Sequence, residues 1–201
     1  MIINIFIINL KNYYLNKKMS INNNNFSYCP KCGEKNTIQY IEKYWKCNKC
    51  PFILYHNAAS ASAVIISDNE NNILFEIRAK DPKKGMLACP GGFTDSDETI
   101  EENVIRECKE EIGVEPINIE YLCSCPNDYH YKGFDYKTCD VYFTGKLPEG
   151  VNLKDIKIDK SEVNDICFKK VEKQEDIDKL PIAFSSLKMA LSIWVKKYGR
   201  K

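Results

Sequence analysis

The hydrophobic and polar positions of residues 58–200 predict a mixture of strands and helices. Ala61–Ser67 is an apolar run rich in valine and isoleucine, and Ile73–Ala79 is a second apolar segment. The polar stretch 68–72 between them favours a turn, so we expect these two strands to pair as a hairpin. Pro90-Gly91-Gly92 follows, and this composition predicts tight, irregular backbone.

The second half of the chain continues this mixture. A helix is predicted over Thr99–Ile112, and Gly113 behind it suits a C-terminal cap. A closing helix is predicted over Phe184–Tyr198, where apolar residues recur at helical spacing. Three further strands are expected, at Asn118–Cys125, Tyr136–Leu147 and Asp165–Lys170. Strands flank both helices without strict alternation, which predicts an α/β or α+β fold.

The N-terminal quarter differs in character from the rest. Residues 1–26, with a run of asparagines, predict a disordered or loosely docked leader, and Met19 is an alternative start of translation. Met1–Leu10 is apolar but too short to span a bilayer, and its flanks do not favour a signal peptide. Paired cysteines fill residues 27–54, so we expect a small domain there and a main domain over 58–200.

Bulk composition narrows the class of protein. The chain has 201 residues, 44% of them hydrophobic, which is enough for one catalytic domain with a small satellite. A net charge of +1 provides no global field for nucleic acid or a membrane surface. Ten cysteines in a chain of this length favour a reducing, cytoplasmic location over a secreted disulfide framework.

The predicted helix at 99–112 is strongly acidic. Residues 95–111 contain eight acidic and two basic side chains, a local net charge of −6. Glu107, Glu110 and Glu111 stand at i, i+3 and i+4, which places three repelling carboxylates on one helical face. A solvated surface is the alternative interpretation. Oxygen ligands at this spacing favour Mg²⁺ or Mn²⁺, while an apolar seam of Ile100, Val104, Cys108 and Ile112 can face the core.

The spacing of these residues resembles the sequence box of the Nudix hydrolase family. Gly92 is followed after five residues by Glu98, and after seven more by Arg106-Glu107-Cys108, Glu110-Glu111 and Gly113-Val114. Every fixed position of the box is filled, with Cys108 where the family more often has an aliphatic residue. The resemblance implies a Nudix α/β/α sandwich with a mixed sheet, and metal-dependent cleavage of a phosphoanhydride bond.

The resemblance also implies roles for individual residues. Glu107, Glu110 and Glu111 would bind Mg²⁺ or Mn²⁺, and Arg106 would orient Glu107 through a charge-assisted hydrogen bond. Glu98 would support the loop–helix geometry or the metal shell. A further carboxylate is expected from the loop before a late strand; Glu162 matches that place, as metal ligand or general base, with an exposed loop glutamate as the alternative.

Substrate contacts are expected around the start of the box. The backbone of Gly91 and Gly92 can approach a metal or phosphate closely because it lacks Cβ atoms, and Phe93 continues the family's lead-in. Tyr129 is a candidate for stacking on a base, with core packing as the alternative.

The paired cysteines predict a zinc site. Cys29 and Cys32 are followed after fourteen residues by Cys47 and Cys50, a spacing typical of a structural tetrahedral Zn²⁺ ribbon, with a hairpin expected over Thr37–Lys46. Redox dithiols or free cysteines are the alternatives. The ribbon could act as a folding staple, as the surface of a homodimer, or as a nucleic-acid contact through its lysines and aromatic residues.

A four-cysteine ribbon before a Nudix domain resembles the NADH pyrophosphatase branch of the family. That branch has a Ser-Gln-Pro-Trp-type motif after the box, whereas this chain has Ser124-Cys125-Pro126-Asn127. The substrate implied is a nucleoside diphosphate derivative of the NAD(H) or ADP-ribose type. Two alternatives stay open: a zinc-ribbon RNA-binding or cap-cleaving protein, and a catalytically silent nucleotide sensor.

Overall fold

The computed structural model describes residues 26–199, apart from residues 42, 69, 152–153 and 155. The leader predicted for residues 1–26 therefore lies outside the described residues, except for Phe26. The chain divides into two compact units, Met1–Asn57 and Ala58–Lys201. None of the described helices is long and apolar enough to cross a membrane.

The first unit is a three-stranded antiparallel sheet of β1 (Ile38–Ile41), β2 (Tyr44–Cys47) and β3 (Ile53–Tyr55). The hairpin predicted for this region is confirmed, because β1 pairs directly with β2. Among its described residues, the buried hydrophobic core contains Cys29, Ile38, Trp45 and Cys47. Two of these four are cysteines, so apolar burial alone gives this unit little stability.

The second unit contains two sheets and three described helices. The sheets have the strand orders β10-β5-β6 and β7-β4-β9-β8, and β4 runs parallel to β9 while the other pairs are antiparallel. The strands are β4 (Ala59–Ile66), β5 (Asn72–Arg78), β6 (Leu87–Ala88), β7 (Gly91–Phe93), β8 (Ile117–Tyr131), β9 (Phe134–Lys146) and β10 (Val163–Lys170). The helices are α2 (Ile100–Ile112), α3 (Gln174–Asp178) and α4 (Ser185–Tyr198).

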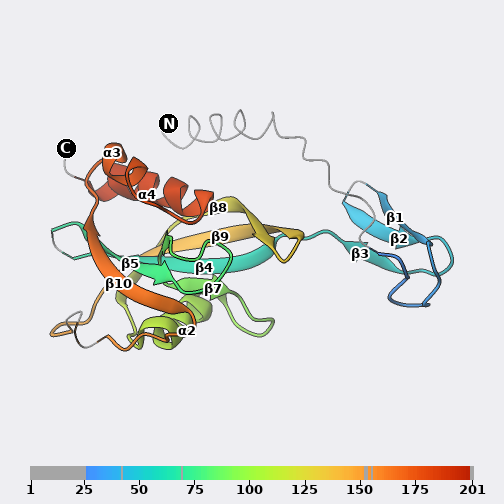
Figure 1. The fold of residues 1–201 in the computed structure, drawn as a ribbon, viewed down its shortest axis with the longest axis horizontal. Coiled ribbons are helices and arrows are strands. Elements are labelled where there is room, and N and C mark those ends of the chain that lie inside the picture. Colours follow the sequence, from blue (N-terminus) through green and yellow to red (C-terminus); the bar gives the residue numbers. More distant parts are fainter. Residues whose placement is uncertain (1–25, 42, 69, 152–153, 155, 200–201) are drawn as a thin grey trace. The chain divides into compact units, whose positions relative to one another are not determined.

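The strands of this unit lie between α2 and α4 (Figure 1). Alternate residues of β4 serve the two sides: Ile65 packs in one core with α4, whereas Val64 and Ile66 pack in another with α2. A strand that is buried on both faces reads as a continuous apolar run, which is the pattern of residues 64–66. The predicted α/β/α sandwich with a mixed sheet is confirmed.

The predicted hairpin between Ala61–Ser67 and Ile73–Ala79 is wrong. β4 and β5 belong to different sheets and meet only through an isolated bridge between Ser67 and Ile73. The turn is real, because the Asp68 carboxylate accepts hydrogen bonds from the backbone of Glu70 and Asn72. Beyond it the strands separate, because all eight residues of β4 pair with β9 and each strand thereby gains a longer partner.

The two helices predicted from the sequence are both present. The helix at 99–112 is confirmed, with Thr99 as its N-cap and Gly113 as a left-handed C-cap at φ 65°. The closing helix is confirmed as α4. The backbone after Pro90 is more regular than predicted, because Gly91–Phe93 forms the short strand β7 against Ala61–Ala63.

Candidate active site

Helix α2 is fixed at its start and along one side. Thr99 and Glu102 form a capping box, in which the Thr99 hydroxyl accepts from the Glu102 N–H and the Glu102 carboxylate accepts from the Thr99 N–H. Val104, Cys108 and Ile112 are fully buried, as the apolar seam predicts. The helix therefore holds its carboxylate face in one orientation, toward a cavity.

This cavity has a volume of about 840 Å³. It brings together most of the residues singled out from the sequence, which share a position on its wall: Glu107, Glu110, Glu111, Arg106, Glu162, Gly91, Gly92, Phe93 and Tyr129. Glu98 is the exception, because it does not line the cavity. Acidic side chains, glycine backbone and aromatic side chains thus line a single cavity, although these residues are up to 71 positions apart in the sequence.

Glu98 lies behind the cavity wall and holds Arg106. Nε and Nη2 of Arg106 donate to the two carboxylate oxygens of Glu98 at 3.0 and 2.7 Å, a bidentate pair. The hydrogen bonds from Arg106 lower the pKa of Glu98 to about 2. Nη1 of Arg106 lies 3.0 Å from Glu107 Oε1 and 3.0 Å from Glu110 Oε2. Glu98 thus supports a guanidinium that in turn orients two carboxylates of the helix.

Gly91 and Gly92 lie against the same carboxylates. A Cβ at residue 92 would fall 2.4 Å from Glu107 Oε1, and one at residue 91 would fall 2.1 Å from the Ser62 carbonyl oxygen. The Gly91 N–H also donates to Glu111 Oε2 at 2.8 Å. The backbone can therefore approach Glu107 this closely only because residue 92 lacks a Cβ, and it can pair this closely with β4 only because residue 91 lacks one.

Burial makes the acidic wall of the cavity unusual. Glu111 is 8% exposed, and this burial raises its pKa to about 8. Burial also raises the pKa of Glu107, although Arg106 opposes that shift. Glu76 on β5 is 3% exposed, and burial together with the charge of Glu111 raises its pKa well above the ordinary value. Like charges held this close out of water favour a cation between them.

The donor set suits a hard divalent cation. Carboxylate oxygens are the ligands that Mg²⁺ and Mn²⁺ prefer, and Glu107, Glu110, Glu111 and Glu162 all present theirs to the cavity. The Glu107 carboxylate packs directly against the Gly92 backbone, in the place that a Cβ atom would otherwise occupy. These residues therefore fit the metal that the sequence box implies.

Glu162 reaches the cavity from the loop before β10. Its carboxylate forms an ion pair with Lys80 at 2.7 Å, and its side chain is 43% exposed. The backbone ties the same loop to β5, because the Ala79 N–H donates to the Glu162 carbonyl oxygen. Glu162 therefore lines the cavity and is held there by Lys80, and its role as metal ligand or general base stays a prediction.

Aromatic side chains form another part of the cavity wall. Tyr129 lies edge-on to Phe93, with ring centroids 5.3 Å apart, and is stacked with Phe184 at 5.7 Å. The Arg78 guanidinium lies over the Phe184 ring, 5.1 Å from its centroid. A planar base can pack on such a surface, and a cation beside it can meet a phosphate.

Sequence reasoning missed several residues of this cavity, among them Arg78, Phe184 and Glu76. Arg78 and Phe184 reach it only through the tertiary fold, and no local pattern identifies them. Glu76 carried a signal, because a charged residue interrupts the apolar run from Ile73 to Ile77 of a buried strand.

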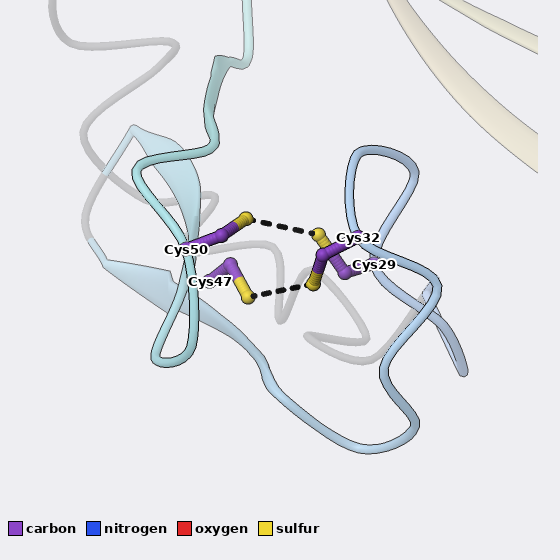
Figure 2. Close-up of side chains that lie close together, drawn as sticks. All are labelled: Cys29, Cys32, Cys47 and Cys50. Atoms are coloured by element: carbon purple, nitrogen blue, oxygen red, sulfur yellow. Dashed lines mark hydrogen bonds between the residues drawn. The ribbon is translucent and has the colours of Figure 1, made fainter.

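The four cysteines of the first unit form a separate cluster, shown in Figure 2. Their sulfur atoms all lie within 4.8 Å of one another, with 3.7 Å between Cys29 and Cys50 and 3.9 Å between Cys32 and Cys47. These separations are too long for disulfides. A tetrahedral zinc site with Zn–S bonds of about 2.3 Å has S–S edges of about 3.8 Å, so the cluster fits zinc.

The surroundings of Cys47 favour a thiolate. The Thr37 hydroxyl lies 3.3 Å from the Cys47 sulfur, and this hydrogen bond lowers the pKa of the thiol to about 6. A thiolate is the form in which cysteine binds a metal.

Comparison with known proteins agrees with this geometry. The family model of the NUDIX domain matches residues 56–186. The chain belongs to the Nudix family. The Nudix hydrolase of Nitrosomonas europaea has the same fold, with a TM-score of 0.61 and 22% sequence identity over 86% of this chain and 92% of that one.

Two curated relatives are similar over part of their length. NAD-capped RNA hydrolase NudC of Vibrio atlanticus (strain LGP32) is 33% identical over 99 residues, which cover 49% of this chain and 36% of that protein. ADP-ribose pyrophosphatase of Methanocaldococcus jannaschii is 46% identical over 61 residues, 30% of this chain and 35% of that protein. The chain thus matches only about a third of the length of these relatives.

Proposed function

We propose that this Nudix protein is a Mg²⁺- or Mn²⁺-dependent pyrophosphohydrolase acting on a nucleoside diphosphate derivative of the ADP-ribose or NAD(H) type. The observation that carries the proposal is the single cavity in which the carboxylates of α2, the Gly91-Gly92 backbone and an aromatic wall meet. A diphosphate joined to a base needs these surfaces together. The names of the two curated relatives support the same class of substrate.

Each acidic residue has a proposed part in the reaction. Glu107, Glu110 and Glu111 would hold the metal, which when bound neutralises the diphosphate and activates water for attack on phosphorus. Arg106 keeps Glu107 and Glu110 in place through contacts of 3.0 Å, and Glu98 anchors Arg106 from behind. Glu162, on the loop before β10, would serve as a further ligand or accept the proton of the attacking water.

The remaining surfaces would bind the substrate. The Gly91-Gly92 backbone allows a phosphate to approach the carboxylate side closely. Phe93 and Tyr129 would pack against the base, and Phe184 continues that wall. Arg78 and Lys80, which also line the cavity, would offset the charge of the phosphate that leaves.

The first unit would bind a structural Zn²⁺ through Cys29, Cys32, Cys47 and Cys50, since four thiolates close the coordination sphere. All ten cysteines are free thiols in the structure, and this supports a reducing, cytoplasmic setting. Cleavage of capped RNA is a second candidate function. The name of the relative from Vibrio atlanticus favours it, and so do the lysines of the four-cysteine unit.

A nucleotide panel tests the proposal. NADH, NAD⁺, ADP-ribose, dinucleoside polyphosphates and NAD-capped RNA are each incubated with the full chain in Mg²⁺ and in Mn²⁺, and the products are resolved by chromatography. We expect metal-dependent cleavage between the two phosphorus atoms of at least one free dinucleotide or ADP-ribose. Preferential cleavage of the capped RNA would favour the second candidate. No cleavage with either metal would overturn the proposal, and binding of a nucleotide without cleavage would favour the sensor alternative.

A further inference from the structure

Glu76 is a buried acid that the residues of the Nudix box do not explain. It lies on β5 in the same row as Leu74, and its cross-strand partner on β10 is Ile166. Leu74 and Ile166 both pack against the core beneath α2. Strand periodicity therefore assigns residue 76 an apolar position, and a carboxylate there is costly unless something compensates for it.

The surroundings of Glu76 offset the cost of burying its carboxylate only in small part. Glu76 is 3% exposed, and within the described part of the chain its Oε1 has no hydrogen-bond partner. The positive charge of Arg78 favours the ionised form of Glu76 and lowers its pKa, against the effect of burial. That guanidinium is engaged elsewhere, because its Nε donates to the Pro82 carbonyl oxygen at 2.8 Å and its plane lies over Phe184.

The side chain of Glu76 lines the cavity of the candidate active site and meets the carboxyl group of Glu111. Glu111 in turn is held by the Gly91 N–H at 2.8 Å. Two buried carboxyl groups from different elements, one on a strand and one on the helix, thus interact in the wall of the same cavity. A hard divalent cation is the partner that would satisfy both.

We propose that Glu76 is an additional ligand of the divalent cation, which it shares with Glu111 from the sheet side of the cavity. This inference rests on the proposed Mg²⁺- or Mn²⁺-dependent function. It extends the metal site beyond α2 and the Glu162 loop to a third element. It also makes Glu76 the residue that couples the position of β5 to metal binding.

The test is a Glu76→Gln variant, which preserves size and removes the negative charge. Titration with Mn²⁺, followed by the electron paramagnetic resonance signal of free Mn²⁺, measures affinity without substrate. We expect the variant to bind Mn²⁺ at least tenfold more weakly than the unaltered chain. We also expect a higher melting temperature without metal at neutral pH, because the variant no longer buries a carboxyl group that must take up a proton on folding. Added Mn²⁺ should raise that temperature less than in the unaltered chain.

Asp140→Asn is the matched control. Asp140 is also a buried carboxylate of the same cavity, but Thr138 and Ser186 each donate a hydrogen bond to it at 2.6 Å. Its loss should leave Mn²⁺ affinity within twofold. A Glu76→Gln/Glu111→Gln double variant should bind no more weakly than the Glu111→Gln variant, since both residues contact one ion.

Several results would overturn the assignment of Glu76. These are an unchanged Mn²⁺ affinity in Glu76→Gln, fully additive losses in the double variant, or a Glu76→Gln protein that is less stable without metal or does not fold. If the unaltered chain itself binds no Mn²⁺, the proposed function fails together with this inference. If it binds Mn²⁺ and cleaves substrate while Glu76→Gln binds equally well, only the inference fails.

Discussion

The four-cysteine unit and the acidic cavity both gather side chains that become anionic, yet they differ in what surrounds those groups. In the first unit, Cys29 and Cys47 are two of the four residues that make up the buried core. In the second unit, the carboxylates stand beside two complete apolar cores, one with α2 and one with α4. The candidate metal ligands thus belong to the core in the first unit, whereas in the second unit they lie outside the two apolar cores.

This difference predicts how a bound metal would affect folding in each of the two units. Where ligands form the core, binding a metal contributes the folding free energy itself, as in small zinc domains. Where the ligands lie beside an apolar core that does not include them, the metal offsets the cost of burying neighbouring carboxylates, and the fold does not depend on the metal. The proposed zinc and the proposed Mg²⁺ or Mn²⁺ should therefore have opposite effects when each is removed.

Zinc removal is the largest expected effect. Stripping the metal should unfold the first unit, because structural zinc contributes about 10–16 kcal/mol to small zinc domains. The two tryptophans report separately on the two units, since Trp45 is buried in the first and Trp194 in the second. With 5-fluorotryptophan at both positions, chelation should shift the ¹⁹F signal of Trp45 to its unfolded value and leave that of Trp194 in place.

Cysteine variants sharpen this test. Cys47→Ser should reproduce the effect of the chelator, whereas Cys139→Ser, which replaces an exposed cysteine of β9, should change neither signal. A Trp45 signal that survives chelation in protein shown by elemental analysis to be zinc-free would mean that the four-residue core folds unaided. The contrast between the two units would then collapse.

The Glu111→Gln variant is the converse experiment in the second unit. Turnover should fall by about 10³-fold, or ~4 kcal/mol of transition-state stabilisation, because a buried ligand of the proposed metal is lost. The fold should persist, and the melting temperature without metal should not decrease at neutral pH, since the variant no longer buries a carboxyl group that must take up a proton on folding. Steady-state kinetics and thermal denaturation measure the two quantities.

Glu101→Gln is the control for loss of one charge from the same helix, because Glu101 is an exposed residue of the first turn of α2. It should retain activity within about twofold. Turnover by Glu111→Gln close to that of this control would remove Glu111 from the proposed metal site.

Stability should depend on pH in a direction set by the acidic cavity. Burial raises the pKa of Glu111 from 4.5 to about 8, so between these values the folded protein holds a proton that the unfolded chain releases. The free energy of unfolding of the metal-free protein should then decrease as pH rises from about 5 to about 8. The slope should be at most ~1.4 kcal/mol per pH unit for this group. Urea denaturation at several pH values measures it.

The Glu111→Gln variant should show a smaller slope over the same range. Saturating Mg²⁺ should also reduce it, because the proton of Glu111 must leave before the metal binds. A metal-free protein whose stability rises across this range would contradict the burial argument for Glu111.

The two regions also differ in how far sequence predicts them. Cysteine pairs two residues apart and carboxylates at i, i+3 and i+4 are local patterns, so the cluster at residues 29–50 and the acidic face of α2 could be located in advance. The partner of β4 could not, because its eight residues pair with residues 138–145, far along the chain. The turn at Asp68 led us to predict that β4 pairs with β5, the next strand in the sequence, but β4 pairs with the distant strand β9 instead.

The same limit applies to the cavity. The carboxylates that α2 contributes were predicted, whereas Phe184 and Arg78 come from separate elements and meet only in the folded chain. Glu76 stands between these cases. A glutamate in the run Ile73–Ile77 was visible in the sequence, but its meaning required knowing that β5 faces Glu111.

The smallest expected effect concerns the start of α2, and it asks whether the carboxylate face depends on the cap or on the core. Thr99→Ala removes the hydroxyl that accepts from the Glu102 N–H at 3.2 Å, and such a loss costs about 1 kcal/mol. Thr99→Ser keeps that oxygen and should cost much less. Because Val104, Cys108 and Ile112 anchor the helix beyond its first turn, kcat should change by less than about twofold in either variant. A large loss of kcat in Thr99→Ala, restored in Thr99→Ser, would show instead that the cap sets the position of Glu107 and Glu111.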